Sequence, residues 1–210
     1  MNTEGPITGF LNKIFNMLAL SIMWLVGCLP VVTIGASTAA LYYTAVKVCR
    51  KDTGYLHREF FKSYKQNLKQ GCAMTIIVAF FVLLLLYNRS YMKLADGKEA
   101  AWFAGFYTVA MVLIIALSMY MFPVLSRFHM TVTNMIKLSF FAMIRYFFST
   151  VLLVVIFGAG AIVCIQYPLF LVVIPGLVVY VQSFVMERVL HKFMEKPEAG
   201  SDEEQQWYNI

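Results

Sequence analysis

The chain has 210 residues, of which 60% are hydrophobic and only 13% are charged, and its formal net charge is +6. A soluble domain carries about a quarter of charged residues, and a soluble core of this size cannot hide so much apolar surface. The composition therefore excludes an ordinary soluble domain. It predicts an all-α fold, a polytopic bundle of five to six transmembrane segments with basic interfacial helices on the cytoplasmic side.

Intervals without charge locate the predicted spans, because a helix needs about 20 apolar residues to cross the hydrocarbon core. They comprise residues 14–46, 70–88, 100–126 and 146–186, with 33, 19, 27 and 41 residues. The last interval holds two helices, since Gln166 and Pro168 interrupt it. We predict one membrane domain over residues 1–196: a hairpin at 10–50, a basic linker at 51–70, and spans at about 71–88, 101–125, 146–165 and 169–187.

The N-terminal hairpin is interrupted by LPVVTIGAS at residues 29–37. Pro30 removes a backbone donor, and Gly35 permits conformations closed to other residues. A second helix is expected from about Thr38 to Arg50, with Thr33 or Ser37 as its N-cap. If both helices cross the membrane, the protein has six segments and a cytoplasmic N-terminus; if the second is re-entrant or interfacial, it has five.

Lysine and arginine are retained near the cytoplasmic ends of spans, so their distribution predicts orientation. The segment 47–69 carries seven of the seventeen basic residues, more than any other loop. With this segment inside, the C-terminus is cytoplasmic as well. The last residues, 197–210, are polar and acidic, and we predict a cytoplasmic tail there.

The basic linker mixes cations with aromatic residues. Such a helix lies in the interface against anionic headgroups, or it docks a partner protein; the sequence does not separate the two. The candidate docking residues are Arg58, Lys62, Lys65 and Lys69.

A short internal likeness relates the linker to a segment eighty residues later. Phe60, Phe61 and Lys65 match Phe140, Phe141 and Arg145, each ahead of a predicted span. Chance and duplication explain the match about equally well.

Between their ends, the predicted spans carry no Asp, Glu, Lys, Arg or His, whereas proton-coupled carriers usually display such a residue. No catalytic, zinc or phosphate motif is present. We therefore expect no enzyme activity, no metal and no cofactor, and no nucleic acid among the partners. The interrupted helix is the best candidate for a ligand site, because a helix N-terminus within a bundle presents free amides. The candidate ligand residues are Thr33, Gly35, Ser37, Tyr42 and Tyr43.

The stretch WLVGCLPVVTIGASTAALYY at residues 24–43, the basic REFFKSYKQNLKQ at 58–70 and, more faintly, PLF at 168–170 resemble the YesL family of small bacterial membrane proteins, a domain of unknown function. The resemblance implies the bacterial cytoplasmic membrane. Because YesL genes often lie beside sugar-uptake or polysaccharide-degradation genes, it also implies a role near carbohydrate uptake. It supplies no binding or catalytic residues.

Two functions follow as hypotheses. The first is an accessory or scaffold subunit that binds a membrane partner, such as a carbohydrate transporter subunit, through its cytoplasmic basic helices. The second is a small transporter or channel for a neutral or anionic solute, with the interrupted helix at residues 33–37 as its site. Membrane-embedded enzyme chemistry is the weakest alternative, because no acid or base is placed in a predicted cleft.

Overall fold

A computed structural model describes residues 6–51, 53–94, 98–128 and 130–193. The described residues form helices and connecting turns, with no strand among them. The predicted acidic tail at 197–210 lies outside this part of the chain. In chain order the elements are α1 (Pro6–Gly27), η1 (Val31–Thr33), α2 (Ile34–Thr44), η2 (Ala45–Arg50), α3 (Leu56–Leu94), α4 (Lys98–Arg127), α5 (Val132–Arg145), α6 (Phe147–Gln166), η3 (Pro168–Val172) and α7 (Ile174–Leu190).

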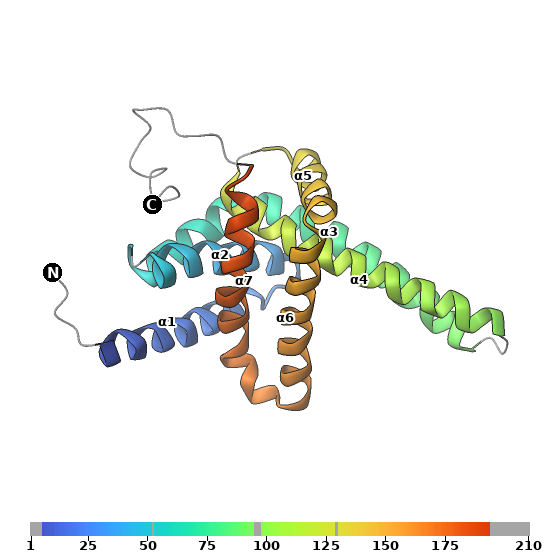
Figure 1. Cartoon of the computed structure of the whole chain (residues 1–210), viewed down its shortest axis with the longest axis horizontal. Coiled ribbons are helices and arrows are strands. Elements are labelled where there is room, and N and C mark those ends of the chain that lie inside the picture. Colours follow the sequence, from blue (N-terminus) through green and yellow to red (C-terminus); the bar gives the residue numbers. More distant parts are fainter. Residues whose placement is uncertain (1–5, 52, 95–97, 129, 194–210) are drawn as a thin grey trace.

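Two helical hairpins diverge from a common base. The long α3–α4 hairpin extends to one side, and the α6–α7 hairpin points in another direction (Figure 1). Helix α2 lies at the base, where it contacts α1, α3, α4 and α7. The main buried core gathers there, with Tyr42, Met74, Tyr120 and Met186 among its side chains. The base of the molecule is therefore closely packed, whereas the ends of both hairpins expose many large apolar side chains.

Four helices are long and apolar enough to cross a membrane: Val31–Arg50, Leu56–Met92, Trp102–Arg127 and Phe147–Gln166. The expectation of a helical membrane protein is thus confirmed. The apolar part of α1, Asn12–Gly27, is shorter, and α7 has 17 residues, at the lower limit for a span. Five or six spans remains a prediction.

The basic linker and the span predicted after it form one helix, α3, of 39 residues. The predicted linker and the predicted span meet near residue 70, and α3 continues through Gly71 without interruption. The missing side chain of this glycine lets α3 approach α2. The buried residues Phe60, Ser63, Asn67 and Gly71 recur at intervals of three and four, the spacing of one helix face. Burial of this face keeps α3 helical across the predicted boundary.

Helix α2 begins at Ile34, four residues before the predicted start. Thr33 occupies the N-cap position without capping. Its hydroxyl lies 2.8 Å from the Gly27 carbonyl oxygen and 2.7 Å from that of Pro30. The amide of Gly35 donates to Thr75 Oγ1 on α3, at 2.8 Å. A tertiary contact therefore satisfies a first-turn donor that a local cap usually satisfies.

Small residues set the crossing of α2 and α3. A Cβ added at Gly71 would lie 2.6 Å from the Ala36 nitrogen and 2.7 Å from its Cα. One added at Gly35 would collide with Thr75 Oγ1 and lie 2.6 Å from the Gly71 carbonyl oxygen. Close backbone approach through small residues is typical of membrane helix pairs. The LPVVTIGAS segment thus serves as a packing element in this fold.

The internal likeness does not extend to the structure of its two segments. Residues 60–69 lie within α3, whereas residues 132–145 form the separate helix α5. Phe60 is 1% exposed in a small core with α2, and its counterpart Phe140 is 52% exposed. The matched aromatic residues therefore have different environments.

Candidate functional site

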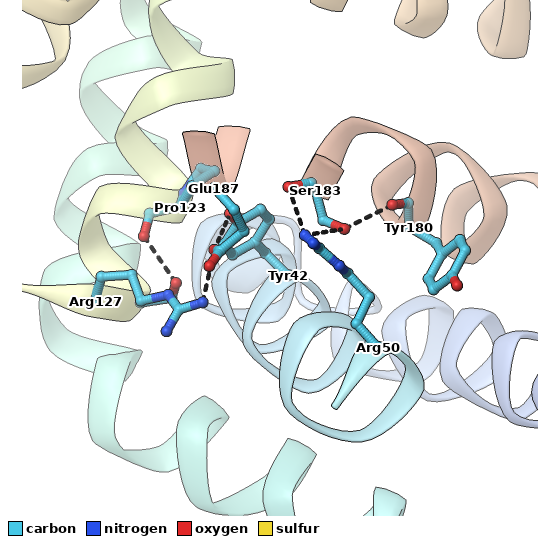
Figure 2. Close-up of polar contacts among 8 residues, drawn as sticks. Tyr42, Arg50, Pro123, Arg127, Tyr180, Ser183 and Glu187 are labelled. Carbon is cyan, nitrogen blue, oxygen red and sulfur yellow. Dashed lines mark hydrogen bonds and ion pairs between the residues drawn. The ribbon is translucent and has the colours of Figure 1, made fainter. Parts of the chain in front are cut away.

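A buried charge cluster joins three helices at the base of the bundle (Figure 2). The last residue of α4, Arg127, donates from Nη2 to Glu187 Oε1 of α7 at 2.6 Å. Tyr42 of α2 donates its hydroxyl to the same oxygen at 2.7 Å. The side chains of Arg127 and Glu187 are 1% and 8% exposed. A carboxylate this deeply buried is stable as an anion only with partners of this kind.

Arg50 lies next to this cluster, at the end of the π-helical segment η2. Its Nη1 donates to the Ser183 carbonyl oxygen at 2.9 Å, and its guanidinium lies 4.2 Å from the centre of the Phe184 ring. The following residue, Lys51, has a pKa below its ordinary value because burial disfavours its charged form and Arg127 repels it. Among the described residues, Arg127, Arg50 and Lys51 thus lie close to the Glu187 carboxylate.

The cluster is suited to holding helices together. Glu187 Oε1 already accepts hydrogen bonds from a guanidinium and a phenol, so the carboxylate is engaged as an ion-pair partner. Within the described part of the chain, no group of three or more His, Cys, Asp or Glu side chains is arranged to hold a metal ion.

Arg127 and Glu187 are not among the predicted site residues, because each directly follows a charge-free interval and so resembles an ordinary charge at the end of a span. Both do lie near helix ends, but they are buried and paired. One signal was present: Glu187 is the only acidic residue between positions 100 and 194. A solitary acid beside a long apolar segment indicates a buried partner.

A cavity of about 460 Å³ lies next to the cluster. It is lined mainly by apolar residues of α2, α4, α6 and α7, with contributions from α1 and η3. Tyr42 belongs to both the cavity wall and the charge cluster. The other side chains with hydrogen-bonding groups in the wall are Trp24, Thr38, Ser118 and Gln182.

The structure divides the predicted ligand residues among separate places. Thr33, Gly35 and Ser37 are buried where α1, α2 and α3 meet, and Ser37 donates to the Trp24 carbonyl oxygen at 3.0 Å. Of the five residues, Tyr42 alone is part of the cavity wall. The Tyr43 hydroxyl instead accepts from Lys47, at 3.2 Å. The predicted residues therefore do not form one pocket.

The predicted docking residues do share one face. Arg58, Lys62, Lys65 and Lys69 are spaced by four, three and four residues along α3, which places them on one side of the helix. Lys62 is half-buried and the other three are exposed. We call these four residues the basic stripe. It lies opposite the face of α3 that carries Phe60 and Gly71.

The apolar helices and their exposed ends indicate a multi-helical membrane protein. Residues 17–89 match the family model described as "Protein of unknown function, DUF624", which is the family of YesL proteins. The resemblance expected from residues 24–43 and 58–70 is confirmed. No curated protein and no solved structure matches the chain.

Proposed function

We propose that this protein is a non-enzymatic accessory or scaffold subunit that docks an acidic surface of a membrane partner through the basic stripe on α3. The observation that carries the proposal is the geometry of the stripe. Four cations follow one helix face, and the opposite face is buried against α2. Complementary charge of this kind favours orientation and partner choice.

The stripe is held rigidly. Phe60 packs among buried residues of α1 and α2, including Leu20 and Leu41. One turn from the helix start, Glu59 pairs with Lys47 of η2 at 2.8 Å. Side chains on a fixed helix lose less conformational freedom on binding than side chains on a mobile loop. The structure thus presents the cations in a defined register.

The length of α3 supports placing the stripe outside the hydrocarbon core. A helix of 39 residues extends for about 58 Å, whereas the core is about 30 Å thick. The basic first turns therefore suit the interface or the aqueous side. The distribution of basic residues favours the cytoplasmic side, with the C-terminus cytoplasmic. The resemblance adds the bacterial cytoplasmic membrane and a carbohydrate transporter as the expected partner.

The test is charge reversal along the stripe. In the triple variant R58E, K65E and K69E, the amount of partner recovered is expected to fall at least about tenfold, because three attractive charge contacts become repulsive. The measurement is crosslinking in native membranes followed by affinity purification in mild detergent. The recovered partner is identified and quantified by mass spectrometry against the wild-type protein.

The matched control is K137E, R145E and R188E, which makes the same change of net charge at exposed residues outside the stripe. It is expected to leave partner recovery within about twofold of wild type. Equal loss in both variants would contradict specific docking. If the stripe variant kept the partner and lost only the anionic phosphatidylglycerol that co-purifies with it, the stripe would be a lipid contact instead.

A further inference from the structure

We propose that the cavity between α2, α4, α6 and α7 binds an uncharged lipid-like molecule, with a hydrocarbon chain and a single hydroxyl or carbonyl group. The cavity volume of about 460 Å³ lies within the usual range of about 300–1,000 Å³ for small-molecule sites. Such sites combine apolar walls with a few polar groups that orient the ligand. This cavity has both features.

The rim of the cavity indicates where the ligand comes from. Phe157, Ile165 and Leu171 belong to the lining and are also among the exposed large apolar side chains. Helix α6 is a candidate span, so its exposed apolar residues face the hydrocarbon of the bilayer. Of these, Phe157 lies in the middle of α6, so an opening beside it would face lipid. This position favours a lipid-like occupant.

The polar groups of the wall indicate an uncharged head. No Asp, Glu, Lys, Arg or His is among the lining residues, and an unpaired charge placed there would lose its hydration. Glu187, which accepts from the Tyr42 hydroxyl of the wall, is already paired with Arg127. A neutral group is the one that the site can accept at low cost.

Gln182 is the side chain that can recognise this group. Its Nε2 donates to the Leu153 carbonyl oxygen at 3.2 Å. Within the described residues its second N–H and its carbonyl oxygen make no hydrogen bond, and the side chain lines the cavity. The amide can therefore donate to a carbonyl or accept from a hydroxyl. Hydrocarbon alone would leave both functions unsatisfied.

The test uses a photoactivatable sixteen-carbon alcohol with the full-length protein in nanodiscs, and mass spectrometry of the adducts. We expect adducts on cavity residues such as Cys164, and competition by unlabelled hexadecanol but not by palmitate. A161F, which fills the cavity, is expected to lower this labelling at least about tenfold. Q182L is expected to weaken competition by hexadecanol about fivefold, the loss of one hydrogen bond.

Two matched controls sit outside the cavity. A159F makes the same enlargement at an exposed position two residues earlier on α6, and Q166L makes the same polar-to-apolar change at the exposed end of that helix. In both variants, photolabelling and its competition by hexadecanol are expected to equal those of the wild-type protein. Equal labelling of A161F and A159F, or adducts spread over all lipid-facing residues, would overturn the proposal, and so would competition by palmitate equal to that by hexadecanol.

A second measurement keeps the proposal testable if A161F does not fold. In a variant with Cys28, Cys49 and Cys72 replaced by alanine, hexadecanol is expected to slow alkylation of Cys164 by N-ethylmaleimide at least threefold, an effect of about 0.7 kcal/mol. Unchanged alkylation at saturating hexadecanol would overturn the proposal.

Discussion

Replacing Glu187 with alanine is expected to lower the free energy of unfolding by about 3–5 kcal/mol, the cost of breaking a buried ion pair. The substitution leaves the Arg127 guanidinium buried beside Arg50 and Lys51 without the carboxylate, and it removes the acceptor of the Tyr42 hydroxyl. The measurement is unfolding in mixed micelles of mild detergent and SDS, followed by tryptophan fluorescence.

A double variant separates the ion pair from simple loss of packing. Replacing both Arg127 and Glu187 with methionine should cost less than E187A alone, because a buried pair exchanged for apolar residues of similar size is often neutral or stabilising. As an internal comparison, E59A removes a less buried partner of Lys47 and is expected to cost about 1 kcal/mol or less. If E187A lowered the free energy of unfolding no more than E59A does, the charge cluster would not be what stabilises the contact of α2, α4 and α7.

Replacing Gly71 with alanine is expected to destabilise the protein by about 1–3 kcal/mol or more, the range for overpacking in a close-packed interior. The added methyl group meets the backbone of Ala36, which is part of a helix and cannot rotate away. Helices α2 and α3 must then separate, and the hydrogen bond from the Gly35 amide to Thr75 is stretched. Thermal unfolding in detergent, followed by circular dichroism, measures the effect.

Gly158 is the matched control, because nothing lies within 4 Å of a Cβ added there. It is also within a helix, α6, so alanine is expected to stabilise the protein by up to about 1 kcal/mol through helix propensity alone. The two substitutions are chemically identical and have opposite expected signs. A stabilising G71A would show that α3 and α2 do not pack through this glycine.

The sequence predicted a large part of the fold because the relevant signals are local. Spans expected at 101–125 and 146–165 correspond to α4 and α6, since hydropathy over one helix length decides whether a segment prefers lipid. The predicted interruption at Pro30 lies between the end of α1 at Gly27 and the start of α2 at Ile34. Proline is a local signal, because it restricts only the backbone next to it. The spacing of the basic stripe could likewise be read from residues 58–69.

The candidate sites were harder to predict, because they depend on which helices meet. Glu187 contacts Arg127, 60 residues earlier in the chain, and Tyr42, 145 residues earlier. Each of the three residues also had a simpler local interpretation. The continuity of α3 through Gly71 likewise depends on α2 packing against it.

Composition and hydropathy were enough to predict a helical membrane protein, because they measure the preference of each segment for lipid. The YesL-type motif could be read from residues 24–43 alone. The packing role of the LPVVTIGAS turn, the buried pair formed by Arg127 and Glu187, and the cavity beside this pair became visible in the three-dimensional arrangement of the helices. Buried ion pairs, close helix approach and cavities are formed by several segments together, so no single segment encodes them.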